Sequence, residues 1–272
     1  MLRTEMRNER TTHIDKMSTL EMVQLINSED RRVIDAVNEV LPQIAQAIDA
    51  VTDAFNNGGR LFYIGAGTSG RLGVIDAAEC PPTYGVPRDM VQGIIAGGTK
   101  TMIQASENEE DNEEAGVKDI MERGLCGKDV VVGISVAGGA AYVIGALNKA
   151  KELDCVTVAL TGNPDSKIAN IADIAITPDT GAEVVTGSTR MKAGTAQKLV
   201  LNMISTCSMI KTGKVYENMM INLRPTNIKL EDRVVRIAVE ITGYSYEKAK
   251  QMLEENDWSL RKVADIYEES KK

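Results

Sequence analysis

Five short apolar runs, separated by stretches of helical spacing, constrain the fold of this chain more than any other feature. Between the runs, apolar residues recur at helical spacing, for example over 113–123 and 140–153. Continuous apolar strands that alternate with helices predict βαβ units, and hence an α/β fold with a parallel sheet covered on both faces. The runs are LFYIGA (61–66), VQGIIAG (91–97), DVVVGIS (129–135), VTVAL (156–160) and ADIAIT (172–177).

The ends of three of these runs predict where a ligand would bind. The first, second and third runs end in glycine or other small residues, at 65–67, 96–98 and 133–135. Parallel sheets of this kind bind ligands at the carboxyl ends of their strands. We therefore expect one pocket at that edge of the sheet.

Helices are expected on both sides of the strand-forming region. Residues 18–57 predict two helices, of which the first opens with the capping-box pattern Ser18-Thr19-Leu20-Glu21 and the second covers roughly 30–56. A further long helix is predicted over about 188–213.

The pattern of apolar residues changes after Pro225. From there to the C-terminus the pattern predicts three short helices, with breaks near 242–243 and 256–257. We therefore expect two domains, 1–224 and 225–272.

Composition and charge argue against several classes of protein. The 272 residues carry a formal net charge of −8 without any cluster of Lys or Arg, so no nucleic-acid partner is expected. No secretion signal and no run of ~18 apolar residues is present, so we expect a cytoplasmic protein without a membrane span. The single histidine, His13, lies in a polar leader, which leaves acid–base chemistry to carboxylates or lysines. Neither a disulfide framework nor a zinc site is expected from the four scattered cysteines, Cys80, Cys126, Cys155 and Cys207.

The segment GAGTSG follows the first predicted strand and precedes a helix. Gly65, Gly67 and Gly70 fit the G-x-G-x-x-G spacing of dinucleotide-binding loops, but no acidic residue ends the second strand as that interpretation requires. Thr68 and Ser69 are hydroxyl donors suited to a sugar or a phosphate at a helix start. A tight turn without a ligand is the alternative.

A glutamate precedes two prolines in the segment ECPPT. Residues 69–78 have a helical pattern, and Pro81-Pro82 are expected to end that helix. Glu79 would then lie at the helix end, where the negative end of the dipole favours a neutral carboxyl group and so a general acid. A solvated glutamate is the alternative.

Two further segments could supply polar groups to the pocket. The acidic run 106–116 is expected to be mostly a solvated helix start, with only one or two carboxylates facing the pocket. In GAEVVTGSTRMKAGTAQK (181–198), hydroxyl and basic side chains that include Ser188, Thr189 and Lys192 gather before a helix. This pattern predicts a second anion-binding helix start, or alternatively a simple cap by Ser188.

Taken together, these segments resemble the N-acetylmuramic acid 6-phosphate etherases, and more distantly the glucokinase regulatory protein, which has the same sugar-isomerase (SIS) fold. The resemblance implies a flavodoxin-like three-layer sandwich with a five-stranded parallel sheet. The last helices resemble a ubiquitin-associated (UBA-like) three-helix module. The segments that carry the resemblance are STLEM, GAGTSGRLGVIDAAECPPTYG, IAGG, EED, GAEVVTGSTRMKAGTAQKLVLNMIST and KTGKVYENMMINL.

The resemblance also implies an activity and the residues that perform it. The family cleaves the D-lactyl ether of N-acetylmuramic acid 6-phosphate, without a metal or organic cofactor, in a homodimer whose site is completed across subunits. By motif position, Glu79 matches the acid that protonates the departing lactate. Glu110 of EED matches the second active-site glutamate, a candidate for proton transfer at C2. The expected substrate-binding residues are Gly67, Thr68, Ser69, Ser135, Ser188, Thr189 and Lys192.

The loop after the third strand departs from the family pattern A-S-G-R-T-P-Y. Ala137, Gly139 and Ala140 replace the serine, arginine and threonine that hold the phosphate, while Ser135 and the glycine amides remain. Each lost charged hydrogen bond is worth ~1.5–3 kcal/mol. A non-catalytic sugar-phosphate sensor is therefore the alternative function, and aldose–ketose isomerisation a weaker third.

Overall fold

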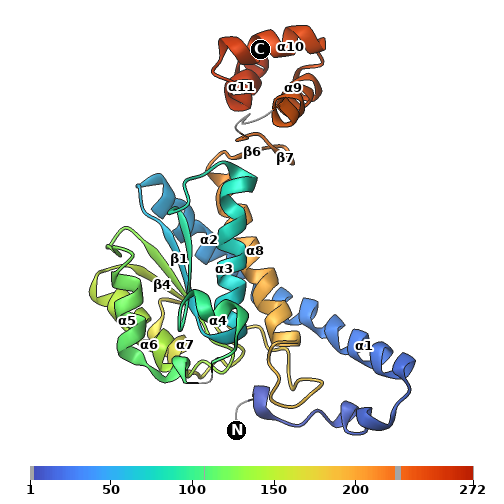
Figure 1. Ribbon diagram of the computed structural model, residues 1–272, viewed down its shortest axis with the longest axis vertical. Coiled ribbons are helices and arrows are strands. Elements are labelled where there is room, and N and C mark those ends of the chain that lie inside the picture. The colour runs from blue at the N-terminus through green and yellow to red at the C-terminus, as the bar shows by residue number, and fades with distance from the viewer. Residues whose placement is uncertain (1–2, 107, 224–227, 272) are drawn as a thin grey trace. The chain divides into compact units, whose positions relative to one another are not determined.

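The computed structural model describes residues 3–106, 108–223 and 228–271 of the chain (Figure 1). Contacts divide the chain into two compact units. The first contains the residues up to Ala78 together with Asp89–Thr206, and the second contains Glu79–Arg88 together with the chain from Cys207 onward. The predicted boundary at 224–225 lies outside the described residues.

A five-stranded parallel sheet forms the centre of the first unit, which confirms the predicted α/β class and SIS-type sheet. Its strand order is β2-β1-β3-β4-β5. Leu61 pairs with Val91 on one side and with Val130 on the other, so β1 lies inside the sheet. The strands are β1 (Leu61–Gly65), β2 (Val91–Ile95), β3 (Val130–Ile134), β4 (Val156–Leu160) and β5 (Ile174–Ile176).

Helices cover both faces of this sheet, because successive side chains of β1 point to opposite faces and both sets are buried. Phe62 and Ile64 pack in an apolar cluster with α5 (Glu113–Met121) and α6 (Ala141–Glu152), which Figure 1 shows together on one side. Tyr63 points the other way and donates a hydrogen bond to the carbonyl of Leu201, 3.5 Å away. Each such buried side chain contributes roughly 1.5–3 kcal/mol, so both faces stabilise the sheet.

The two N-terminal helices are α1 (Thr19–Asn38) and α2 (Leu41–Asn56). The predicted capping box is confirmed, because the Ser18 hydroxyl accepts from the Glu21 amide and the Glu21 carboxylate accepts from the Ser18 amide at 2.7 Å. The expected start of the second helix near residue 30 was wrong. Pro42 has no amide hydrogen for the carbonyl four residues earlier, so the break falls just before it.

The helix after β1, α3 (Gly67–Tyr84), does not end at the double proline as expected. Pro81 and Pro82 lie inside it. The helix ends at Gly85, whose φ of +63° is the left-handed conformation of a helix C-terminus and whose amide donates to the Pro81 carbonyl. Glu79 therefore lies in the body of the helix. The two prolines have no amide hydrogen to donate within the helix, but the helix continues past them.

The three helices predicted at the C-terminus are present. They follow a two-stranded antiparallel hairpin and share an apolar cluster that includes Val234, Leu253 and Val263. The long helix predicted over 188–213 is shorter at both ends. The remaining elements are α4 (Thr99–Ile103), α7 (Lys167–Ile171), α8 (Lys192–Lys211), β6 (Val215–Tyr216), β7 (Met219–Met220), α9 (Ile228–Thr242), α10 (Tyr246–Glu255) and α11 (Leu260–Ser270), with 3-10 turns η1 (Arg3–Glu5), η2 (Glu9–Thr11), η3 (Ile14–Lys16) and η4 (Glu109–Asp111).

Within the part of the chain that the structure describes, no helix is long and apolar enough to cross a membrane.

Candidate active site

A pocket of about 330 Å³ opens where β1 and β3 end, as the strand ends predicted. This volume is within the range of small-molecule sites. The pocket brings together six of the predicted site residues from four separate segments of the chain. Its lining residues are Glu5, Ala66, Gly67, Thr68, Ser69, Glu110, Ile134, Ser135, Val136, Ala137, Ala140, Gly187 and Thr189.

The turn between β1 and α3 forms one wall of this pocket. Gly67 has a φ of +53°, a conformation that favours glycine. A Cβ on Gly70 would lie 2.5 Å from the carbonyl oxygen of Gly65, so glycine is required at that position. The first amides of α3 begin at this wall, and such amides bind anions. The hydroxyl of Ser69 is 3.0 Å from Oε1 of Gln197 and donates to it, so Ser69 can only accept from a ligand.

The loop after β3 forms the facing wall. The buried Ser135 hydroxyl accepts from the Gly138 amide at 3.2 Å, which leaves its own proton for a ligand. Gly138 has a φ of +72°, and a Cβ there would lie 2.3 Å from Ser166, so the turn requires glycine. A Cβ on Gly139 would meet no heavy atom within 4 Å, so a side chain could begin there without a clash.

The two predicted catalytic glutamates have different positions. Glu110 lies in η4, is exposed, and lines the pocket. Glu79 is also exposed, but it belongs to the second compact unit and is not among the residues that line this pocket. Glu110 is therefore the catalytic candidate that the first unit itself contributes.

The segment before α8 contributes less to the pocket than the sequence predicts. Thr189 lines it, whereas Ser188 does not. Lys192 is fully buried, and its Nζ lies 2.7 Å from Oε2 of Glu29, so its ammonium group is held inside the protein. The anion at this helix start is the protein's own: Glu183 accepts from the backbone amides of Lys192 and Ala193 at 3.0 and 2.9 Å.

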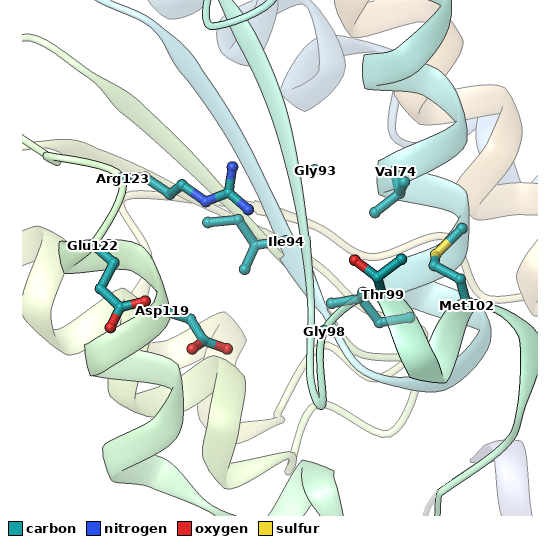
Figure 2. A pocket seen from close by; sticks show the side chains of 10 residues that line it. Val74, Gly93, Ile94, Gly98, Thr99, Met102, Asp119, Glu122 and Arg123 are labelled. Atoms are coloured by element: carbon teal, nitrogen blue, oxygen red, sulfur yellow. The ribbon is translucent and has the colours of Figure 1, made fainter.

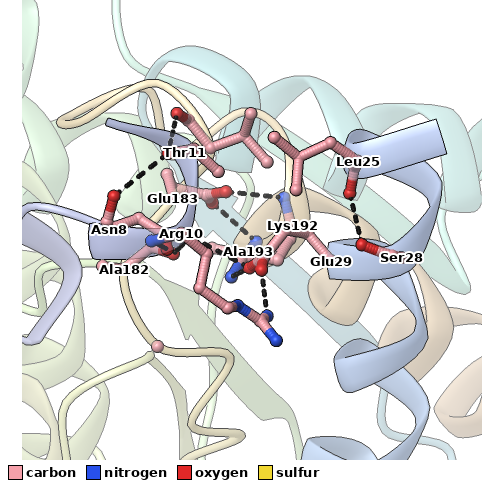
Figure 3. Close-up of polar contacts among 12 residues, drawn as sticks. Asn8, Arg10, Thr11, Leu25, Ser28, Glu29, Ala182, Glu183, Lys192 and Ala193 are labelled. Carbon is pink, nitrogen blue, oxygen red and sulfur yellow. Dashed lines mark hydrogen bonds and ion pairs between the residues drawn. The ribbon is translucent and has the colours of Figure 1, made fainter. Parts of the chain in front are cut away.

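A buried polar cluster surrounds Lys192 (Figure 3). Asn8 and Arg10 also donate to the Glu29 carboxylate. Burial alone would raise the pKa of Glu29, but hydrogen bonds from Lys192 and Asn8 and the charges of Lys192 and Arg10 hold the pKa below its ordinary value. Burial raises the pKa of Glu183, although the backbone hydrogen bonds that its carboxylate accepts act to lower that pKa. The cluster thus joins the N-terminal segment, α1 and α8, because Arg10 and Lys192 both pair with Glu29.

Glu5 is the charged lining residue that the sequence did not predict. It lies in η1, in a polar leader where no spacing or turn signal separates it from neighbours such as Glu9. Only the tertiary structure brings it to the pocket.

A second pocket, of about 250 Å³, lies beside the edge strand β2 (Figure 2). Asp119, Glu122 and Arg123 lie on one side of the strand, with Val74 and Met102 among those on the other. The Asp119 carboxylate accepts a hydrogen bond from the Tyr142 hydroxyl at 2.6 Å. None of the predicted site residues lines this pocket, so we place the candidate active site at the ends of β1 and β3.

Known families match most of the chain. Residues 43–151 match the glucokinase regulatory protein N-terminal SIS domain, and residues 123–206 match the SIS domain. The N-acetylmuramic acid 6-phosphate etherase of Yersinia pestis (strain Pestoides F) is 54% identical over 258 residues, which are 95% of this chain and 88% of the relative. This chain belongs to the N-acetylmuramic acid 6-phosphate etherase family. The etherase of Yersinia pseudotuberculosis serotype O:1b (strain IP 31758) has the same identity and coverage.

Solved structures agree with the fold of this etherase family member. A phosphoheptose isomerase from Neisseria gonorrhoeae aligns with a TM-score of 0.55 at 23% identity, covering 70% of this chain and 98% of that one. A putative phosphosugar isomerase from Bacteroides fragilis NCTC 9343 gives a TM-score of 0.56 at 20% identity, covering 74% and 95%. At these identities the likeness shows a shared SIS fold.

Proposed function

We propose that this protein cleaves the D-lactyl ether of N-acetylmuramic acid 6-phosphate to give N-acetylglucosamine 6-phosphate and D-lactate. The observation that carries the proposal is the 54% identity to etherases over 95% of the chain. The pocket supports it, because it combines an anion-binding helix start, a Ser135 hydroxyl and the Glu110 carboxylate. The same identity favours an enzyme over a sugar-phosphate sensor.

The proposed chemistry needs two carboxyl groups. The sugar opens to its aldehyde, which makes the C2 proton acidic, and Glu110 removes that proton. Glu79 protonates the lactate oxygen as the bond to C3 breaks, and water then adds to the unsaturated aldehyde. One carboxylate as base and one carboxylic acid as proton donor are sufficient for this elimination.

In this proposal the substrate phosphate lies at the start of α3. The amides from Gly67 onward and the hydroxyls of Thr68, Ser135 and Thr189 line the pocket where an anion would be held. Lys192 has no direct part, because its ammonium group is paired with Glu29.

We also propose that the protein is a cytoplasmic homodimer whose site is completed across subunits. Glu79 is not among the lining residues of the pocket, and a second copy would supply it. The three C-terminal helices would form a UBA-like bundle that packs on the dimer and does not bind ubiquitin. Their shared apolar cluster, which includes Val235, Leu253 and Leu260, supports the bundle.

The deciding experiment is incubation with N-acetylmuramic acid 6-phosphate and an assay for D-lactate. Release of D-lactate together with N-acetylglucosamine 6-phosphate is expected. Stabilisation of the protein by hexose phosphates, with no lactate at high protein concentration, would instead show a sensor.

A further inference from the structure

The N-terminal segment, residues 3–11, adds a carboxylate to the pocket. Glu5 lines the pocket together with Gly187 and Thr189, the residues contributed by the loop before α8. A Cβ placed on Gly187 would lie 3.8 Å from Oε2 of Glu5, so this carboxylate lies beside the loop.

Buried hydrogen bonds fix the chain immediately before Glu5. Thr4 and Asn163 are 2% and 5% exposed. The Asn163 side-chain amide donates to the Val136 carbonyl at 3.0 Å and to the Thr4 hydroxyl at 3.4 Å, and its oxygen accepts from the Arg3 amide at 3.2 Å. Because Val136 itself lines the pocket, Asn163 connects the backbone next to Glu5 to the pocket wall.

A second set of buried contacts fixes the chain after Glu5. The side-chain amide of Asn8 donates to Oε2 of Glu29 at 3.0 Å and to the Ala182 carbonyl at 3.2 Å. The Thr11 hydroxyl donates to the Val184 carbonyl at 2.9 Å. Figure 3 shows Asn8 and Thr11 beside the cluster of Glu29 and Lys192. Such groups are costly to leave unpaired, so segment 3–11 is held in place on both sides of Glu5.

The chemistry of Glu5 differs from that of the other pocket walls. The start of α3 and the hydroxyls of Thr68 and Ser135 offer donors to an anion, whereas a carboxylate can only accept hydrogen bonds. It repels a phosphate and attracts a hydroxyl group. A sugar phosphate carries both groups, so different parts of the pocket wall can hold them.

We propose that Glu5 is a specificity-determining residue that contacts the substrate, because its carboxylate accepts a hydrogen bond from a sugar hydroxyl and so orients the ring relative to the phosphate. The inference rests on the proposed function in naming the ligand as a sugar phosphate. Glu110 keeps the role of base, and segment 3–11 serves to hold Glu5 in place.

The test compares Glu5→Gln with Glu9→Gln in the full chain. Glu9 is an exposed glutamate of the same segment and does not line the pocket. Loss of a charged hydrogen bond should lower kcat/KM for lactate release by about 10- to 100-fold in Glu5→Gln, mainly through KM. Glu9→Gln should stay within about twofold of wild type. A kcat/KM for Glu5→Gln within about twofold of wild type would overturn the proposal.

Binding measurements separate a direct contact from a structural effect. Glu5→Gln should lower the affinity for N-acetylglucosamine 6-phosphate. The affinity for inorganic phosphate should stay the same or rise, because the substitution removes a negative charge that repels the phosphate. An equal loss of affinity for both ligands would show a structural role of Glu5 and overturn the inference. Since these affinities need no turnover, they test Glu5 even if no lactate is released. A wild-type protein that binds no sugar phosphate would overturn both proposals.

Discussion

At the scale of single residues, burial decides what a charged side chain can do. Lys192 is in a segment whose hydroxyl and basic residues suggest phosphate binding, yet it is 0% exposed and bonded to Glu29. Removing one partner of such a buried ion pair strongly lowers the free energy of unfolding, because the other charge is left buried without its partner. Lys192 is accordingly a residue that holds the site together.

Replacing Lys192 by methionine should leave Glu29 buried with Arg10 and Asn8 as its remaining partners. We expect the free energy of unfolding to fall by about 3 kcal/mol, measured by urea denaturation. Lys262→Met removes an exposed lysine paired with Asp257 and serves as the control, with a loss below about 1 kcal/mol. Equal effects of the two substitutions would contradict the structural role of Lys192.

Asp76 gives a prediction about pH. It is buried on α3, where Asn202 and Ser205 donate to its Oδ1 at 2.6 and 3.1 Å, and burial raises the pKa of its carboxyl group above 3.8. A raised pKa in the folded state means that the stability contributed by Asp76 is present at low pH and is lost as the pH rises through that pKa. Asp76→Asn does not ionise. The variant should therefore gain stability relative to wild type as the pH rises.

This difference can be measured by urea denaturation of both proteins between about pH 4 and pH 7. The control is Asp265→Asn, which removes an exposed carboxylate paired with Arg261 and should not gain stability relative to wild type as the pH rises. A stability difference between Asp76→Asn and wild type that does not change with pH would contradict the assignment.

At the scale of elements, the loop between β3 and α6 is the part of the pocket that departs from the family pattern. Gly138 keeps the turn, while Ala137 and Ala140 line the pocket with methyl groups. Ala140 is also the N-cap residue of α6 and forms no side-chain cap. The family's serine, arginine and threonine would thus restore donors to the pocket and a cap to the helix.

The triple variant Ala137→Ser, Gly139→Arg, Ala140→Thr should bind inorganic phosphate more tightly than wild type. A Cβ at Gly139 meets no heavy atom within 4 Å, and each charged hydrogen bond contributes ~1.5–3 kcal/mol. Ala140→Thr alone should stabilise the protein by about 1 kcal/mol through the new cap. Calorimetric titration and thermal unfolding measure the two effects. Unchanged phosphate affinity would show that this loop does not hold the anion.

At the scale of the whole molecule, the proposed chemistry needs two glutamates that belong to different compact units. Glu110 lies in the first unit and Glu79 in the second. Both are exposed, so Glu79→Gln and Glu110→Gln should each fold normally. Each variant should lose roughly 10²–10⁴-fold in lactate release, as expected for removal of a general acid or base.

Mixing the two variants tests the proposed dimer. If each site takes Glu79 from one subunit and Glu110 from the other, a mixed dimer contains one intact site and one doubly altered site. An equal mixture, refolded or co-expressed, should then recover about a quarter of the wild-type activity. No recovery in a mixture shown to contain mixed dimers would place both glutamates in the same subunit.

The sequence by itself determined the strands, the order of helices and much of the pocket. Apolar runs, capping residues and glycine turns are local signals, and strand ends in a parallel sheet meet at one edge. Gly67, Thr68, Ser69 and Ser135 could therefore be placed together in advance. Tyr84 remains helical beyond two prolines, which local rules did not predict.

Only the tertiary structure decided which charged groups line the pocket and which pair with each other. Lys192 pairs with Glu29, which is 163 positions away in the sequence. Glu5 lies at the pocket because buried hydrogen bonds on both sides of it hold the N-terminal segment in place. Both outcomes depend on burial of groups that are far apart in the chain. Periodicity and turn chemistry carry no information about such pairs, because they describe neighbours along the sequence.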